Sequence, residues 1–144
     1  MFKRILVPTD GSDITAKAVQ TAIALARQEG ATVYAISVKE PFPYSAISEM
    51  QPVPPQDFFD AQDRIANKRV HAVVEIAHAA GMKCQAHTVE ALHPWEAIID
   101  HARHMECDLL VMASHGRRGM SALLLGSETQ KVLTHSTIPV LVVR

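Results

Sequence analysis

Hydrophobic residues along the chain follow two alternating patterns, which predict β-strands and α-helices in turn. Short runs rich in β-branched residues are typical of strands, whereas longer segments with apolar residues three or four positions apart are typical of helices. Every expected strand except the last is followed by a helix. The expected strands cover residues 3–7, 32–38, 83–89, 108–113 and 139–143. The expected helices cover residues 13–28, 57–80, 94–105 and 127–135.

Polar and turn-forming residues mark the ends of several elements. Ser12 is placed to cap the first helix, and Gly30 is placed to end it. Ser127 and Gln130 form an S-x-x-Q capping box at the last helix. Residues 39–56 hold five of the eight prolines, so we expect a lid or a mobile loop there instead of regular structure.

This alternation predicts the fold class. Strands separated by helices pair in parallel through right-handed crossovers, and nearly continuous apolar strands are typical of a sheet that is covered on both faces. We therefore expect residues 1–144 to form a single three-layer, doubly wound α/β domain with a five-stranded parallel sheet in the order 3-2-1-4-5. In such domains ligands bind beyond the carboxyl ends of the strands, where the strand order reverses.

Composition and charge narrow the possible functions. The chain has 144 residues, 48% of them hydrophobic, which fits one folded domain and excludes wholesale disorder. Fourteen Lys and Arg residues against fifteen Asp and Glu residues give a net charge of −1. This balance argues against a nucleic-acid-binding protein and against an acidic interaction tail, but it is compatible with one local anion site.

Cellular location is predicted from what the sequence lacks. The apolar run at the amino terminus stops at Pro8, too early for a signal peptide, and no run approaches the length of a membrane helix. The two cysteines, Cys84 and Cys107, form no CxxC pair and are expected to be reduced thiols. We therefore expect a cytoplasmic protein with no membrane contact.

The segment after the fourth strand contains the strongest candidate chemistry. Gly116 and Gly126 would allow a positive φ or the close approach of a ligand. Ser127 begins the last helix, whose free N–H groups and dipole favour an anion, and Arg117 and Arg118 could add positive charge. These are the parts of a phosphate cradle. The capping box and a simple chain turn explain the same residues, so both interpretations stay open at this point.

Other binding motifs are weak or absent. The chain has neither a P-loop nor a dinucleotide GxGxxG after its first strand, so a nucleotide would have to be held in another way. His101, His104 and Cys107 are spaced three apart, but a zinc site needs about four ligands, and solvated or partly buried histidines are far commoner on helices. We therefore predict no metal site.

From end to end the sequence resembles the universal stress protein family. The resemblance runs from Ile-Leu-Val-Pro-Thr-Asp-Gly-Ser at residues 5–12 to Ile-Pro-Val-Leu-Val-Val at residues 138–143. The ATP-binding branch of that family carries G-2x-G-9x-G-[S/T] after the fourth strand. Gly116 and Gly126-Ser127 match it in spacing, and Ala113 replaces the first glycine. An alanine would cost about 1 kcal/mol there if the position needed a positive φ.

The resemblance also implies a set of site residues. Asp10 could accept hydrogen bonds from ribose hydroxyls, or it could serve only as a turn or cap residue. We expect the Glu128 side chain to point outward, leaving its backbone amide available. The residues implied on the base and ribose side are Pro8, Thr9, Asp10 and Val38. The residues implied to flank the ribose and phosphates are Met112, Ala113, His115 and Gly116, followed by Gly126, Ser127, Glu128 and Thr129 on the phosphates.

The function that the resemblance implies is adenine-nucleotide binding in a stress response. The ligand would be ATP or AMP, with Mg²⁺ as a candidate companion. Activity would be at most slow ATP hydrolysis, since no dedicated catalytic constellation is visible. The alternative is a nucleotide-free dimeric interaction module with a vestigial cradle, which Ala113 favours. An adenylating enzyme is disfavoured because residues 8–12 hold one glycine, and a phosphorelay receiver because no lysine follows the fifth strand.

The last strand predicts how copies of the chain associate. Residues 140–143 are Val-Leu-Val-Val, an apolar run without protecting charge. If this run is an edge strand, its unpaired backbone groups invite pairing with another chain, and two-fold symmetry would place the two copies antiparallel. We therefore expect a homodimer through the C-terminal strand, an arrangement that the resemblance also implies.

Overall fold

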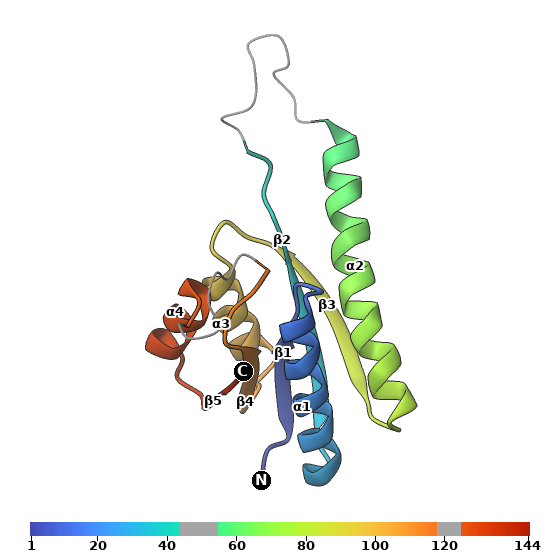
Figure 1. The fold of residues 1–144 in the computed structure, drawn as a ribbon, viewed down its shortest axis with the longest axis vertical. Helices are drawn as coiled ribbons and strands as arrows, with labels where there is room; N and C mark the ends of the chain where they lie inside the picture. The colour runs from blue at the N-terminus through green and yellow to red at the C-terminus, as the bar shows by residue number, and fades with distance from the viewer. Residues whose placement is uncertain (44–54, 118–124) are drawn as a thin grey trace.

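The computed structural model describes residues 1–43, 55–117 and 125–144, in which a central sheet is flanked by helices (Figure 1). The lid expected over residues 39–56 lies mostly outside the described residues. The strands are β1 (Arg4–Pro8), β2 (Thr32–Lys39), β3 (Cys84–Glu90), β4 (Leu109–Ala113) and β5 (Val140–Val143). The helices are α1 (Asp13–Glu29), α2 (Gln56–Ala79), α3 (Pro94–His104) and α4 (Ser127–His135).

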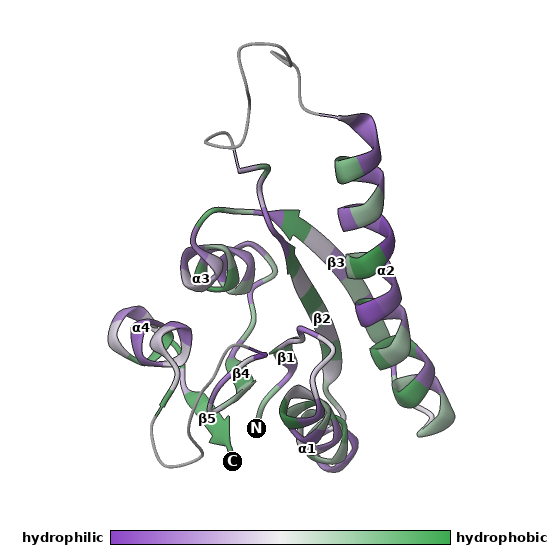
Figure 2. Cartoon of the chain, turned by 45° about the horizontal axis from the view of Figure 1, so that its top comes forward, coloured by the Kyte–Doolittle hydropathy of each residue, from purple (hydrophilic) through white to green (hydrophobic). Residues whose placement is uncertain are grey.

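The sheet has the predicted topology. Its five strands are all parallel and lie in the order β3-β2-β1-β4-β5, with β1 hydrogen-bonded to both β2 and β4. Helices α1 and α2 cover one face, and α3 and α4 cover the other (Figure 2). The predicted three-layer, doubly wound fold is confirmed. Helix α2 extends well beyond the sheet at the end where the strands finish (Figure 1).

Two apolar layers hold the sheet between its helices. Ile5 and Val7 are fully buried against α1 and α2, whereas Leu6, between them in sequence, is fully buried on the side of α3 and α4. Successive strand residues point to opposite faces, so a strand covered on both faces needs apolar residues at every position. That requirement explains the unbroken apolar runs of β1 and β4.

The helix ends follow the sequence signals with one exception. Ser12 accepts a hydrogen bond from the Thr15 amide at the start of α1, and Gly30, with φ of 68°, ends that helix as predicted. The predicted capping box of α4 is wrong. Gly126 is the residue before the helix, so Ser127 already lies inside it, and the Gln130 side chain donates to the Leu125 carbonyl oxygen instead.

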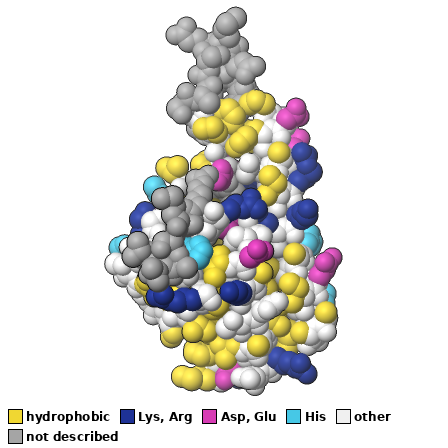
Figure 3. Space-filling view, in the orientation of Figure 1, with side chains coloured by type: hydrophobic (Ala, Val, Ile, Leu, Met, Phe, Trp, Pro, Cys, Tyr) yellow, Lys and Arg dark blue, Asp and Glu magenta, His cyan; other side chains and the backbone are white. Residues whose placement is uncertain are grey.

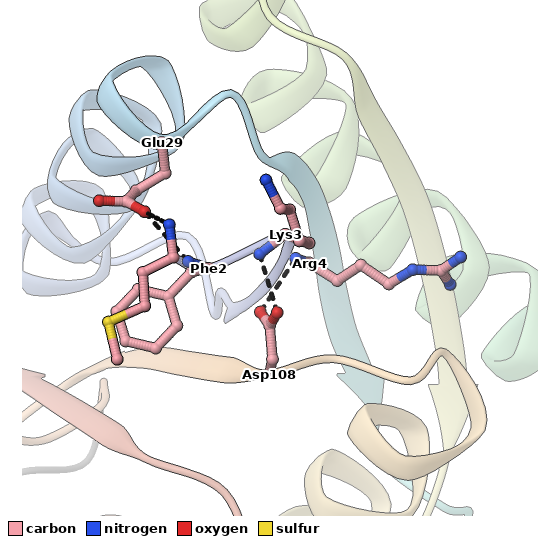
Figure 4. A network of polar contacts seen from close by, with 6 residues as sticks. Phe2, Lys3, Arg4, Glu29 and Asp108 are labelled. Atoms are coloured by element: carbon pink, nitrogen blue, oxygen red, sulfur yellow. Dashed lines mark hydrogen bonds and ion pairs between the residues drawn. The ribbon is translucent and has the colours of Figure 1, made fainter.

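Two carboxylates fasten the beginning of the chain to the rest of the domain (Figure 4). Asp108, just before β4, accepts hydrogen bonds from the amides of Lys3 and Arg4 at 2.8 and 3.0 Å. Glu29, at the end of α1, accepts from the Phe2 amide at 3.0 Å and from the terminal amino group, and these bonds hold the pKa of Glu29 below its ordinary value. The start of the central strand β1 is thereby held by the end of α1 and by the segment just before β4.

The two edges of the sheet are β3 and β5. The edge position predicted for the last strand is confirmed, and Leu141 in its middle is 40% exposed. Within residues 1–43, 55–117 and 125–144, no helix combines the length and the apolarity that crossing a bilayer requires.

Candidate functional site

The carboxyl ends of β1, β2 and β4 bring the predicted site residues to one edge of the sheet. Because β1 lies between β2 and β4, the segments that follow β1 and β4 are neighbours where the strand order reverses. A hollow between the start of α1 and the segment after β4 is lined by residues that include His115 and Gly116. A second hollow, between the end of β3 and α3, contains none of the predicted site residues.

The turn after β1 is built from short polar side chains. Thr9 is buried, and its amide donates to the Ile36 carbonyl oxygen at 2.9 Å. The Thr9 hydroxyl accepts from the Gly11 amide at 3.2 Å. One carboxylate oxygen of Asp10, Oδ1, accepts from the Ser12 amide at 2.9 Å and from the Thr15 hydroxyl at 3.1 Å. The turn role considered for Asp10 is therefore confirmed.

Asp10 also reaches the segment that follows β4. Its second oxygen, Oδ2, accepts from the Arg117 amide at 2.6 Å. A Cβ atom at Gly116 would lie 2.8 Å from the same oxygen, so the backbone approaches this carboxylate as only glycine allows. One side chain thus bridges two loops that are more than a hundred residues apart in sequence.

Opposing effects set the charge of Asp10. Burial raises the pKa of its carboxyl, whereas hydrogen bonds from Ser12, from the Arg117 amide and from Thr15 lower it. The hydrogen bonds together have the larger effect, so the pKa lies below the ordinary value of 3.8. Asp10 is therefore ionised at neutral pH and acts as a hydrogen-bond acceptor.

Backbone bonds and one imidazole order the segment after β4. The Ser114 amide donates to the Val143 carbonyl oxygen, and the Gly126 amide donates to the Ser114 carbonyl oxygen, each at 2.8 Å. The Ser114 hydroxyl lies 3.1 Å from Nδ1 of His115. Of the two roles considered for His115, a phosphate contact and a loop-ordering hydrogen bond, the structure shows the second.

The two glycines of this segment serve for close packing. Gly126 has a φ of −64°, and Gly116 is not among the glycines with positive φ, so the positive φ considered for both is wrong. A Cβ atom at Gly126 would lie 3.1 Å from the Cα atom of His115. Absence of a side chain at Gly126, and not its backbone freedom, is what lets α4 begin so near His115.

Ala113 fits its position without backbone strain. It is the last residue of β4, pairs with Val143 and is 4% exposed. Its backbone is that of a strand, so the cost expected for an alanine with positive φ does not arise. The Ala113 carbonyl oxygen accepts from the Thr129 hydroxyl at 2.9 Å, which ties β4 to α4.

The first turn of α4 presents backbone groups to the site. Thr129 is buried and its hydroxyl is engaged by Ala113, whereas Ser127 is exposed. The Glu128 carboxylate accepts from the Trp95 amide at 2.8 Å and so points toward the start of α3. Gly126, the residue before the helix, offers no side-chain cap, so among the described residues the first N–H groups of α4 can face an anion.

The remaining predicted residues lie deeper. Val38, next to the end of β2, and Met112 in β4 pack within the apolar layer beneath α3 and α4. Pro8 ends β1 and is half-buried. None of these three residues lines the hollow between the start of α1 and the segment after β4.

Arg69, in the middle of α2, is a site residue that sequence reasoning missed. Its side chain crosses the turn after β1, where a Cβ atom at Gly11 would lie 3.2 Å from Cγ and 3.5 Å from Nε of Arg69. Gly11 has a φ of +78°. Arg69 belongs to no local motif, and only the packing of α2 beside this turn brings it to the site, so the sequence holds no signal for it.

The two cysteines lie away from this edge, since Cys84 begins β3 and Cys107 comes shortly before β4. Cys84 and Cys107 are free, and burial raises the pKa of each thiol to about 11. In the part of the chain that the structure describes, no group of three or more His, Cys, Asp or Glu residues is arranged to hold a metal ion.

The fold and the site together define a doubly wound α/β protein with a candidate ligand site at the reversal of strand order. The model of the universal stress protein family matches residues 1–144, and the chain belongs to that family. The family that the sequence motifs predicted is thus confirmed.

Relatives span the whole chain. Universal stress protein YxiE of Bacillus subtilis is 34% identical over 149 residues, covering 100% of both chains. The solved structure of MJ0577, from Methanocaldococcus jannaschii, has a TM-score of 0.84 at 26% identity and covers 99% of this chain and 96% of its own. A universal stress protein in complex with cAMP has a TM-score of 0.70 at 25% identity, and the match covers 99% of this chain and 97% of that one. One from Archaeoglobus fulgidus in complex with dAMP shares the fold, with a TM-score of 0.70 at 20% identity and 99% and 98% covered.

Proposed function

We propose that this chain binds an adenine nucleotide, ATP or AMP, at the ends of β1, β2 and β4, and that it acts in a stress response as a nucleotide-responsive protein instead of a dedicated catalyst. The observation that carries the proposal is the Asp10 bridge, which holds the turn after β1 against the segment after β4. Relatives in complex with cAMP and dAMP support an adenine nucleotide as the ligand.

Asp10 has the capacity to bind a ribose. A carboxylate offers about four lone-pair sites. Within residues 1–43, 55–117 and 125–144, three donors occupy Asp10, namely the Ser12 amide, the Thr15 hydroxyl and the Arg117 amide. One acceptor position is left for a ribose hydroxyl, with Pro8, Thr9 and Val38 on the base side.

The phosphates would lie at the first turn of α4. Backbone amides of Ser127 and Glu128 supply donors at the positive end of the helix dipole, beside Gly126, whose own amide is bonded to the Ser114 carbonyl oxygen. The segment from Met112 to Gly116 flanks the ribose and phosphates. Mg²⁺ with a triphosphate would be held mainly by phosphate oxygens and water, because the Glu128 carboxylate is turned to Trp95.

The experiment that tests this proposal combines extraction with titration. Small molecules released by denaturing the purified protein are separated by chromatography, and the protein is then titrated with ATP and with AMP in a calorimeter. We expect near-stoichiometric adenine nucleotide in the extract, or binding in the micromolar range at about −8 kcal/mol. No nucleotide and no binding would overturn the proposal and favour the nucleotide-free interaction module.

Homodimerisation through β5 is a second part of the proposal. An exposed apolar residue, Leu141, lies in the middle of an edge strand, and a second copy could continue the sheet there. Light scattering of the purified protein tests it, since a monomer mass would contradict it.

A further inference from the structure

Arg69 brings a cation to the site from an element that contributes no other predicted contact. Helix α2 packs on β2 and β3, and its N-terminal part extends past the carboxyl ends of the strands (Figure 1). Residues along α2 can therefore lie over those strand ends. The Arg69 stem lies across Gly11, directly next to Asp10 in sequence. The side chain is half-buried, which restricts its freedom compared with the exposed cations of the same helix.

Three charged groups from three other segments act on this side chain. Asp10 and Glu40 attract the Arg69 guanidinium, and Arg117 repels it. Burial and the neighbouring Arg117 lower the pKa of Arg69, and the two carboxylates offset this effect only in part. Figure 3 shows basic side chains next to acidic ones near the middle of the face that it presents.

The two guanidinium groups of Arg69 and Arg117 are matched in number by the carboxylates of Asp10 and Glu40. Asp10 already accepts three hydrogen bonds, and one of its oxygens is engaged by the backbone of Arg117. Two guanidinium groups near each other at a partly dehydrated edge are stabilised by an anion between them. Arginine is suited to that role because its planar fork can bond two phosphate oxygens at once.

We propose that Arg69 binds the phosphoryl group nearest the ribose and so makes the site prefer nucleotides to nucleosides. The inference rests on the proposed function, because Asp10 as the ribose acceptor places the sugar beside Gly11, within the path of the Arg69 side chain. It adds a third wall, from α2, to a site otherwise built from the loops after β1 and β4.

Titration with AMP and with adenosine tests this inference. Arg69→Met keeps the apolar stem over Gly11 and removes the charge. We expect it to weaken AMP binding about tenfold or more, as loss of a hydrogen bond to a charged group does, and to leave adenosine binding within about twofold. Arg69→Lys should recover part of the AMP affinity. Arg64→Met, an exposed position on the same helix, is the matched control and should change neither affinity.

Each result separates the Arg69 role from the proposed function. If Arg69→Met weakens the binding of AMP and of adenosine equally, or changes neither affinity, the phosphate role is overturned while nucleotide binding stands. If the unaltered protein binds AMP no better than adenosine, the inference fails without any variant. If the unaltered protein binds neither ligand and no ATP, the proposed function fails together with the inference. Thermal unfolding of each variant shows whether the fold is kept.

Discussion

Among single residues, Asp10 accepts hydrogen bonds from both loops of the site. Asp10→Asn keeps the size of the side chain but replaces one acceptor oxygen with an NH₂ donor. The Arg117 amide or the Ser12–Thr15 pair then faces a donor instead of an acceptor. We expect the free energy of unfolding to fall by about 1–3 kcal/mol and AMP affinity to fall with it. Chemical denaturation and calorimetry measure the two effects.

The exposed Asp13, in the first turn of α1, supplies the matched control. Asp13→Asn should leave AMP affinity unchanged. Because the folded-state pKa of Asp10 is lowered, its ionised form stabilises the protein above the ordinary value of 3.8, and that stability is lost as the pH falls through the folded-state pKa. An Asp10→Asn variant as stable and as tightly binding as the unaltered protein would contradict the bridging role.

Gly126 is tested by adding a side chain where the structure has no room. Gly126→Val places a Cβ atom 3.1 Å from the Cα atom of His115, and two methyl groups extend it further. We expect the overpacking to cost about 1–3 kcal/mol and to abolish ATP binding while the fold is kept. Calorimetry and circular dichroism check the two outcomes. Thr134→Val, exposed and later on α4, is the control, and unaltered affinity in Gly126→Val would place the nucleotide elsewhere.

At the scale of elements, β3 and α3 meet through a pair of imidazoles. The rings of His87 and His101 have centroids 4.7 Å apart, and within the described residues neither buried Nε2 atom has a hydrogen-bond partner. Burial lowers the pKa of both side chains, and nearby imidazoles, including His104 on α3, lower it further. The fold therefore favours two neutral rings, with Tyr34 of β2 stacked on His87.

This pair predicts a stability that depends on pH. The unfolded chain binds protons near the ordinary value of 6.5, but the folded chain binds them only at lower pH, so stability falls as the pH drops below 6.5. We expect the midpoint temperature of thermal unfolding to decrease as the pH is lowered from about 7.5 to about 5.5. His101→Leu should make that decrease smaller. His71→Leu, at an exposed site on α2, should not reduce it. Equal pH dependence in His101→Leu and the unaltered protein would contradict the prediction.

Strand β5 supports a prediction about association. Leu141→Lys puts a charge in the middle of the apolar edge, so we expect light scattering to give the mass of a monomer. Leu133→Lys, on α4, adds the same charge at a leucine of similar exposure, 41% against 40%, and should leave the dimer unchanged. An unchanged dimer mass in Leu141→Lys would exclude β5 as the interface.

Elements are predictable here because their signals are local. Apolar spacing located the ends of each helix and strand to within one residue. The capping box of α4 failed for a local reason as well. A serine before a helix and a serine at its first position look alike in sequence. The close packing of the Gly126 backbone against His115, which the sequence does not show, accompanies the start of the helix at Ser127.

At the scale of the whole molecule, the site divides into a predictable and an unpredictable part. Asp10 and Gly116 follow from topology, since loops after adjacent parallel strands must lie at one edge. Neither the bond from Asp10 to the Arg117 amide nor the position of Arg69 could be predicted. Both depend on how far one element reaches over another, a quantity that tertiary packing sets and that no motif encodes.

Ser114 connects the site to the edge of the sheet. Its carbonyl oxygen holds the start of α4, and its amide holds Val143, the last residue of β5. If the nucleotide and a second copy of the chain each favour one position of this residue, the two affinities are thermodynamically linked, and each raises the other by the same factor. Nucleotide occupancy would then rise with the concentration of the protein itself, so that an abundant protein and a scarce one would respond differently to the same amount of nucleotide in the cell.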